Sequence, residues 1–323
     1  MPALRRRAKR GRGAPLPTLE RSLQARGHPL TRGRPVSATA DVVCSCESGA
    51  MLATARTGGS PMERGRLLHR AYSAERVYPT RNDVRPTDPG ALDFLLTADI
   101  GEGWLHPNAS NYTFVVHLTK DGAESHAVYK PQAGEAPLWD FPSGTLYNRE
   151  VAAYELSRLL GWNFVPPTAI REAELGVGSM QLYVAPMSDS HYFNLREQYP
   201  AEAFRMAVFD LVSNNADRKG GHCFLAQCGG VWGVDHGLTF NVDRKLRTVI
   251  WDFAGQPVPR PFLDDLARVG AQLAGHGSEA CATLSALLAA EEVEVLRRRI
   301  AAVLDRPTMP EPYSRRDLPW PWI

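Results

Sequence analysis

Apolar and polar positions take on a regular pattern from about residue 91 onward. The apolar run LDFLLTADI, residues 92–100, is typical of a β-strand. In the segment 111–131, apolar residues alternate through FVVHL, Asp121-Gly122 supplies a tight turn, and AVYK leads back. The pattern therefore predicts one strand followed by an antiparallel hairpin.

A helix is predicted next, because good helix formers run unbroken over residues 146–160. Thr145 is placed to cap its first turn, and Gly161 is placed to end it. The sequences FVPPTAI and GSMQLYVAP then predict two more strands, joined near Gly176 and Gly178.

After Pro186 the pattern becomes mainly helical, with apolar residues at helical spacing in 197–215. A short hairpin is expected within 223–237. Residues 260–304 predict further helix, most clearly in 284–304. Strands plus one helix come first and a mostly helical part comes last, which predicts an α+β fold with two lobes. A cleft between two lobes is a common place for a ligand.

Residues 1–88 show no sustained period and are rich in Gly, Pro, Arg and Ser. We expect them to be mostly disordered, with one short helix at 62–72. Residues 1–36 carry ten Lys/Arg against Glu20 alone, a charge of +9, whereas the whole chain has +2. Such an arm could contact nucleic acid or anionic lipid, but a leader without a binding role, or one outside the native protein, is favoured.

Composition excludes several classes of protein. Apolar content of 44% and charged content of 22% suit a globular soluble chain. No window has the 18 or more apolar residues of a membrane span, and no secretory signal is recognisable, so the expected location is cytoplasmic. The five cysteines include Cys44 and Cys46 but no second pair at metal-ligand spacing, which disfavours structural zinc or a disulfide framework.

The first candidate for chemistry is the loop NNADRKGGH, which follows the predicted helix 197–215. Asn214 and Asn215 can hold such a loop rigid through backbone hydrogen bonds, and Asp217 lies within it. Asp235 ends the strand VWGV 18 residues later, so that both acids can face one site. Two acids near amide and imidazole groups suit Mg²⁺, although Asn, Asp and Gly are also typical of an ordinary helix-end turn.

A second candidate combines Lys130, which closes the strand AVYK, with Glu150, 20 residues later in the predicted helix. A strand lysine facing a cleft can bind phosphate oxygens, and the glutamate could pair with it. The alternative is a solvated surface pair. Between two strands, HPNASNYTF could cradle phosphates with its backbone, at Ser110 and Asn111.

Strand lysine, helix glutamate, loop aspartate and post-strand aspartate, in this order, are the parts of a kinase. HRD, DFG and GxGxxG are missing. The sequences VYKP, REVAAYELSRLLG, VPPT, NNADRKGGH and GVDHG resemble the phosphatidylinositol 3-/4-kinase-like superfamily, in particular its actinobacterial branch. The resemblance implies a bilobal protein-kinase-like fold, with a basic leader at 1–88, a small antiparallel-sheet N-lobe with one helix at 89–187, and a mainly helical C-lobe at 188–323.

The resemblance also implies an ATP- and Mg²⁺-dependent (or Mn²⁺-dependent) kinase that moves the γ-phosphoryl group to a hydroxyl acceptor. Lys130 would hold the α/β-phosphates, with Glu150 as its ion-pair partner. Val184, Ala185 and Met187 would form the hinge between the lobes, where backbone groups meet the adenine.

The same resemblance gives Asp217 the task of orienting or deprotonating the acceptor hydroxyl. Lys219 would neutralise charge on the transferred phosphoryl group, and Asp235 would bind Mg²⁺. Lipid kinases of this class generally have Asn five residues after the catalytic Asp, where this chain has His222. His222 could coordinate the metal, although imidazole suits Mg²⁺ less than oxygen does, or it could bind phosphate. His236 is expected to be structural.

The acceptor is not defined by the sequence. Arg244, Lys245 and Arg247 follow Asp235 and could recognise an anionic acceptor, such as a lipid headgroup or a phosphorylated peptide. Trp251 and Phe253 could lie on a membrane surface, although a place in the core is favoured. A protein or small-molecule acceptor is equally open, because fold does not fix function.

Three further functions remain open. The chain could be an inactive pseudokinase that binds nucleotide or a partner, which His222 and the absent glycine-rich loop support. It could transfer AMP instead of a phosphoryl group. A nucleic-acid-binding role of the basic arm is the least favoured of the three.

Overall fold

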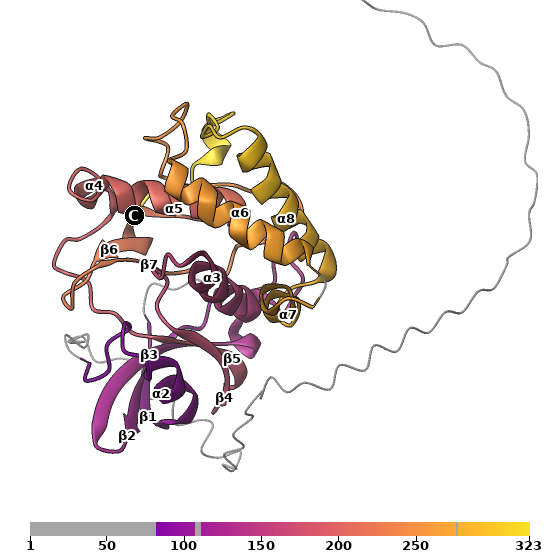
Figure 1. Cartoon of the computed structure of the whole chain (residues 1–323). Coiled ribbons are helices and arrows are strands. Elements are labelled where there is room, and N and C mark those ends of the chain that lie inside the picture. Colours follow the sequence, from indigo (N-terminus) through magenta and orange to yellow (C-terminus); the bar gives the residue numbers. More distant parts are fainter. Residues whose placement is uncertain (1–81, 107–110, 276) are drawn as a thin grey trace, which may run out of the picture. The chain divides into compact units, whose positions relative to one another are not determined.

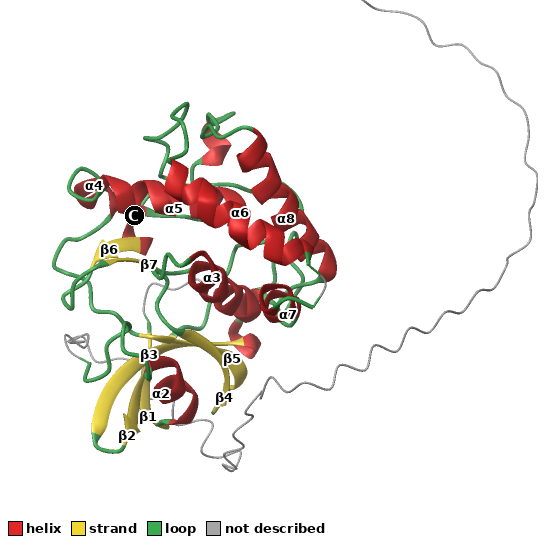
Figure 2. Cartoon of the chain, viewed as in Figure 1, coloured by secondary structure: helices red, strands yellow, loops and turns green. Residues whose placement is uncertain are grey.

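The computed structural model describes residues 82–106, 111–275 and 277–323. The expected disordered leader, up to residue 81, the short helix at 62–72 and Ser110 lie outside the described residues. The described part is α+β, with the five-stranded sheet at one end and most helices, together with a short two-stranded hairpin, at the other (Figures 1 and 2).

A five-stranded antiparallel sheet in the order β1-β2-β3-β5-β4 forms the first lobe. Its strands are β1 Asp99–Leu105, β2 Phe114–Lys120, β3 Ala123–Pro131, β4 Thr168–Ala173 and β5 Gly176–Leu182. The predicted hairpin is β2–β3, and its turn has φ of 53° at Asp121 and 81° at Gly122. Positive φ at both turn residues matches the twist of the flanking strands, which explains the Asp-Gly pair.

The outer face of the sheet is apolar and is covered by α2 (Ala91–Thr97). Residues 92–100 were expected to form a strand, and this prediction is wrong, since a strand begins only at Asp99. Ala91, Phe94 and Leu95 have the i, i+3, i+4 spacing of one helix face, and all three are buried. A short apolar run fits either element, and packing against the sheet stabilises the helix.

The predicted helix is α3 (Leu146–Leu160), which packs against both the sheet and the second lobe (Figure 1). It ends as expected at Gly161, whose φ is 76°. The Thr145 side chain does not cap the helix, since its hydroxyl donates to the Pro142 carbonyl. Glu135 Oε1 instead accepts from the Tyr147 N–H at 2.9 Å, so a carboxylate from the preceding loop caps this end.

The second lobe is mainly helical and contains one short hairpin. Its elements are α4 Tyr192–Leu195, α5 Pro200–Ser213, β6 Cys223–Leu225, β7 Val231–Gly233, α6 Arg260–Ala274, α7 Glu279–Ser285 and α8 Ala290–Asp305. The segment 284–304 is not one helix, since α7 ends at Ser285 and α8 begins at Ala290. At the start of α8, Glu292 Oε2 accepts from the Ala289 N–H. Phe253 is partly buried and packs against the core, where it stacks on Phe204 at 4.3 Å. Within the described residues, no helix is long and apolar enough to cross a membrane.

Candidate functional site

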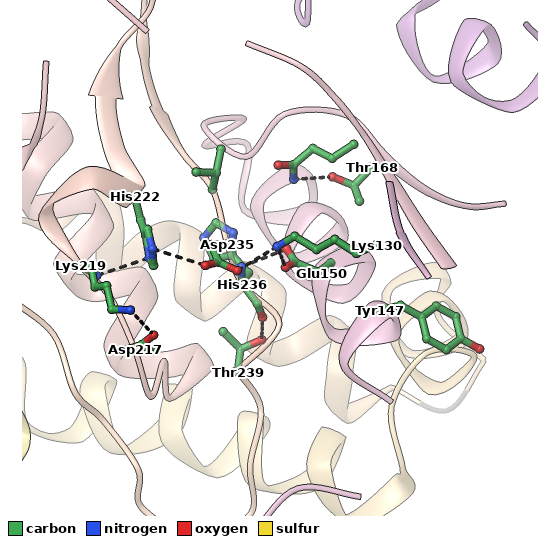
Figure 3. Close-up of polar contacts among 12 residues, drawn as sticks. Lys130, Tyr147, Glu150, Thr168, Asp217, Lys219, His222, Asp235, His236 and Thr239 are labelled. Atoms are coloured by element: carbon green, nitrogen blue, oxygen red, sulfur yellow. Dashed lines mark hydrogen bonds and ion pairs between the residues drawn. The ribbon is translucent and has the colours of Figure 1, made fainter. Parts of the chain in front are cut away.

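Lys130 lies at the point where three elements meet (Figure 3). Its ammonium contacts Glu150 Oε1 on α3 and lies 2.8 Å from Oδ1 of Asp235, just after β7. The second oxygen of Glu150 accepts from the His236 N–H at 2.9 Å. The sheet, α3 and the segment after β7 are thus joined by one cation and two carboxylates.

The electrostatics of this group favour the charged forms. Burial acts to lower the pKa of Lys130, but the carboxylates of Asp235 and Glu150 outweigh it and raise that pKa. The Lys130 ammonium in turn holds the pKa of Asp235 well below its usual range. The lowered pKa keeps the Asp235 carboxylate ionised. Since its side chain is 50% exposed, the carboxylate is also open to a ligand.

Arg149, directly before Glu150, ties α3 to the second lobe. Its guanidinium pairs with Glu292 of α8 and donates to the Thr239 carbonyl at 2.7 Å. The Arg149 and Glu292 side chains are 1% and 10% exposed. The buried ion pair between Arg149 and Glu292 therefore also fixes the position of Glu150, the next residue on α3.

The loop after α5 is fixed by its two asparagines, as the sequence predicts. Asn214 has φ of 56° and donates to the carbonyls of Asn241 and Asp243 at 2.9 and 2.6 Å. Asn215 Oδ1 accepts from the Asp217 N–H at 3.0 Å. These bonds hold the backbone on both sides of Ala216 and so fix the position of Asp217.

Asp217 and Lys219 face each other, with Lys219 Nζ 3.1 Å from Asp217 Oδ2 (Figure 3). Burial raises the pKa of Asp217, and the Lys219 cation opposes this shift. The Asp217 side chain remains 32% exposed. A partly desolvated and accessible carboxylate of raised pKa is suited to accept a proton.

His222 contacts Asp235 through a ring nitrogen, with Nε2 3.3 Å from Oδ2. Its Nδ1 accepts from the Lys219 N–H at 3.4 Å, and burial lowers the pKa of His222 to about 4. In a neutral ring whose Nδ1 accepts, Nε2 carries the proton and donates it to Asp235. This arrangement orients the carboxylate, whereas a metal bond from Nε2 requires the other tautomer.

A metal ion at Asp235 would draw most of its ligands from elsewhere. Among the residues that the structure describes, no three His, Cys, Asp or Glu side chains are grouped to hold a metal. Mg²⁺ is commonly held by one or two carboxylates together with substrate phosphates and water. The half-exposed Asp235 carboxylate fits that pattern.

Arg218 and Asp210 are functional neighbours that the sequence analysis did not single out. Both side chains are fully buried and pair at 3.0 Å, and Arg218 also donates to the Val234 carbonyl at 2.9 Å. Its second amino group lies 2.7 Å from Nε2 of His236, which is itself buried. An acid inside the apolar helix AVFDLV was the available signal, because a buried charge requires a partner.

The expected hinge follows β5 and is bonded to the β6–β7 hairpin. Ala185 O accepts from the Gln227 N–H at 2.9 Å, and the Met187 N–H donates to Leu225 O at 2.8 Å. A cavity of about 380 Å³ lies beside it, lined by Asn82, Asp83, Val84, Arg85, Pro86, Tyr183, Val184, Ala185, Gln227 and Cys228. Val184 and Ala185 thus line this cavity, whereas Met187 is not among its lining residues.

Asn111, expected at a phosphate cradle, supports a loop in this structure. Its Oδ1 accepts from the Ala136 N–H at 2.8 Å. Because Ser110 lies outside the described residues, Asn111 is the one member of the expected Ser110–Asn111 pair that can be placed.

Two of the three cations after Asp235 are already paired. Arg244 lies 3.6 Å from Asp317 and stacks over the Tyr313 ring at 4.2 Å. Lys245 lies 3.1 Å from Asp140. Both therefore stabilise the fold around the site.

Arg247 is placed differently, directly beside Asp217. Its N–H donates to Asn215 O at 2.8 Å, and its carbonyl accepts from the Arg218 N–H at 3.0 Å. The guanidinium is exposed, and the described part of the chain offers it no carboxylate within ion-pair distance. Its charge acts on Asp217 by lowering the pKa that burial raises.

These features define a class of protein. A five-stranded antiparallel lobe, a helical lobe, and a strand lysine bonded to a helix glutamate make this a bilobal, kinase-like α+β fold. The chain belongs to the same family as Protein Rv2133c of Mycobacterium tuberculosis, to which it is 41% identical over 249 residues, covering 66% of this chain and 88% of that protein. No known family model matches the chain.

Solved structures give remote similarities. Hydra Fam20 with sugar has a TM-score of 0.46 and 16% identity, covering 75% of this chain and 93% of that one. The Golgi casein kinase with Mn/ADP bound has a TM-score of 0.44 and 14% identity, covering 66% and 74%. The Helicobacter pylori proinflammatory kinase CtkA has a TM-score of 0.43 and 11% identity, covering 67% and 94%.

Proposed function

We propose that this chain is an ATP-dependent kinase that transfers the γ-phosphoryl group to a hydroxyl acceptor. The observation that carries the proposal is the contact of Lys130 with both Glu150 and Asp235. A lysine held by a helix carboxylate beside an accessible aspartate is the arrangement that positions nucleotide phosphates and a divalent cation in kinases. The order of sequence motifs supports the phosphatidylinositol 3-/4-kinase-like type.

In this proposal Lys130 binds phosphate oxygens, while Glu150 keeps its ammonium in place. Asp235 holds Mg²⁺ or Mn²⁺, and His222 orients that carboxylate through its hydrogen bond. A bound cation supplies positive charge that offsets the charge on the phosphates. The adenine is assigned to the hinge at Val184 and Ala185, beside the cavity.

Asp217 and Lys219 are assigned to the transfer step. The acceptor oxygen forms a bond to the γ-phosphorus, the bond to the leaving ADP oxygen breaks, and the hydroxyl proton passes to Asp217. Lys219 offsets charge on the transferred group, so that catalysis comes mainly from positioning and electrostatics. The raised pKa of Asp217 supports the role of proton acceptor.

Arg247 is assigned to the acceptor. Its backbone is hydrogen-bonded to Asn215 and Arg218, which lie on either side of Asp217, and its side chain is exposed. Arg244 and Lys245, in contrast, already pair with acidic residues. An arginine in this place favours an acceptor that carries a phosphate or carboxylate near its hydroxyl group.

The experiment measures ATP binding by calorimetry and nucleotide products by chromatography, with Mg²⁺ or Mn²⁺. Lys130→Met is expected to weaken ATP binding, and Lys120→Met is its matched control, since Lys120 pairs with Asp93 away from the site. Asp217→Asn is expected to retain binding and lose turnover by about 10²- to 10⁴-fold. Wild-type protein that is folded and binds no ATP would overturn the proposal.

A second candidate is a nucleotide-binding pseudokinase, which the donation from His222 to Asp235 favours over a two-metal kinase. The same experiment separates the candidates. ATP binding without any product, across acceptors of all classes, supports the pseudokinase, whereas release of pyrophosphate in place of ADP supports AMP transfer.

A further inference from the structure

The C-terminal segment 317–323, here called the C-terminal strap, runs from the region after Asp235 to the catalytic loop. It begins at Asp317, which is buried. The Asp317 carbonyl accepts from the Thr248 N–H at 3.0 Å and from Trp251 Nε1 at 3.3 Å. One end of the strap is therefore fixed to the backbone that also carries Arg247.

The other end of the strap reaches the loop that holds Asp217. The carbonyl of Trp322 accepts a hydrogen bond from the Gly220 N–H at 2.6 Å. A Cβ on Gly220 would lie 2.8 Å from Cε2 of Phe193 and 3.2 Å from this carbonyl oxygen. Gly220 is thus enclosed between α4 on one side and the strap on the other, and glycine is the residue that fits.

Gly220 is the first residue of a single helical turn, and the side chains of Lys219 and His222, at the two ends of this turn, extend in different directions. The turn Gly220–His222 is a short 3₁₀ helix, preceded by Lys219. Lys219 extends to Asp217, whereas His222 extends to Asp235. The first N–H groups of such a turn lack partners within it, and the strap supplies the partner of the first one.

We propose that the C-terminal strap positions the catalytic loop, and that Trp322 does so through its main-chain carbonyl. By fixing the Gly220 N–H, the strap sets the direction in which Lys219 leaves the backbone. The catalytic part of this inference rests on the proposed function, since it assumes that Lys219 and Asp217 perform the transfer.

The exposure of the strap side chains argues against a different role, that of a plug covering the site. Trp320 is 82% exposed, Trp322 is 52% exposed and Ile323 is 62% exposed. A segment that blocks a site buries its side chains there, whereas these side chains are exposed and the main-chain carbonyl of Trp322 makes the hydrogen bond to the loop. The strap is therefore assigned to support of the loop.

Three variants isolate the carbonyl. Deletion of residues 322–323 removes it. Ile323→Ala keeps the Trp322 carbonyl while removing the neighbouring side chain, and Trp322→Ala keeps the carbonyl while removing the indole. The readout is hydrogen exchange of the Gly220 amide in the folded chain, followed by NMR or by mass spectrometry of loop fragments.

We expect exchange at Gly220 to rise by about tenfold or more when residues 322–323 are deleted, as for loss of one hydrogen bond of about 1–1.5 kcal/mol. The two matched controls are expected to stay within about twofold of wild type. Gly220→Ala tests the contact from the loop side, because the added Cβ is too close to the Phe193 ring and tight against the Trp322 oxygen, so that the turn must shift between them. Faster exchange is then expected at Gly221 and His222. Unchanged exchange in both the deletion and Gly220→Ala would overturn the proposal.

Turnover adds a separate readout. Deletion of 322–323 is expected to lower kcat by about tenfold, with the ATP dissociation constant unchanged, because the strap contacts the loop and not Lys130. A higher kcat in this deletion would overturn the positioning role in favour of a plug. If the wild-type protein transfers no phosphoryl group, the proposed function fails, and the exchange experiment still decides whether the strap fixes the loop.

Discussion

Lys130 and Asp235 form an ion pair at 2.8 Å, which joins the end of β3, one residue before Pro131, to the segment after β7. The pair links charges from the two lobes at the place where the proposed reaction uses both. Under the proposed function, nucleotide phosphates would take the place of Asp235 beside the Lys130 ammonium, and the cation would take the place of Lys130 beside the Asp235 carboxylate.

From the ion pair of Lys130 and Asp235 we expect ATP binding to depend on Mg²⁺. If Asp235 holds the cation against the phosphates, as proposed, Mg²⁺ is expected to tighten ATP binding in the wild-type protein. In Asp235→Asn that dependence is expected to vanish, while Lys130 stays paired with Glu150. Calorimetric titrations with and without Mg²⁺ measure both, and Asp243→Asn, on an exposed residue of the second lobe, is the control. A retained Mg²⁺ dependence in Asp235→Asn contradicts the assignment.

Stability is expected to depend strongly on Arg218. Replacement by Gln leaves the carboxylate of Asp210 buried without a cation, which costs about 3–5 kcal/mol of the free energy of unfolding. Urea unfolding measures the difference. Arg316→Gln, on an exposed residue, is expected to change stability by less than about 0.5 kcal/mol. If Arg218→Gln lowers the free energy of unfolding by less than about 1 kcal/mol, Arg218 is not the main partner of Asp210.

The pH dependence of turnover is expected to report Asp217. Burial raises the pKa of this carboxyl, so activity should fall with falling pH at a pH above that of an ordinary aspartate, about 3.9. The Lys219 cation lowers the same pKa, and Lys219→Met should therefore move the acidic limb of kcat/KM to higher pH. Lys120→Met, outside the site, should leave it in place. A limb that shifts to lower pH in Lys219→Met contradicts the prediction.

Alkaline stability is expected to report Cys223. Burial raises the pKa of the Cys223 thiol to about 12, whereas an unfolded thiol ionises near about 8.5. Between these values the unfolded state has released its proton and the native state has not, so the free energy of unfolding falls as pH rises. Urea unfolding at pH 8 and pH 10 measures the fall, which should be smaller in Cys223→Ala and unchanged in the exposed control Cys228→Ala. An equal fall in both variants removes the assignment to Cys223.

Local patterns predicted the features that depend on neighbouring residues. The β2–β3 hairpin follows from Asp121-Gly122, and the end of α3 follows from Gly161, because positive φ is required at each position. Asn215 is also local, since its amide oxygen accepts from the Asp217 N–H two residues later. The amide of Asn214 instead donates to the carbonyls of Asn241 and Asp243, which are distant in sequence.

Features that depend on distant partners were not predictable in this way. Residues 92–100 suit a strand or a helix, and only the sheet face beneath Phe94 and Leu95 decides between them. The cap of α3 comes from Glu135 and not from the adjacent Thr145.

The same limit applies around the site. The partner of Arg218 lies in the preceding helix, and the partner of the Gly220 N–H lies about a hundred residues away, at Trp322. Nothing in the pattern near Gly220 indicates that a later segment returns to it. Side-chain chemistry identified Lys130, Glu150, Asp217 and Asp235 as candidates, and the chain's long-range contacts account for how they are held.

The buried pair of Arg149 and Glu292 has a consequence for motion. Turning α3 outward would leave one of these charges buried and unpaired, at a cost of about 3–5 kcal/mol. The helix is therefore expected to travel with the second lobe as one rigid body. Any opening of the site is then expected to be a displacement of the sheet over α3, and under the proposed function Lys130 is the side chain whose contacts would change as nucleotide binds and leaves.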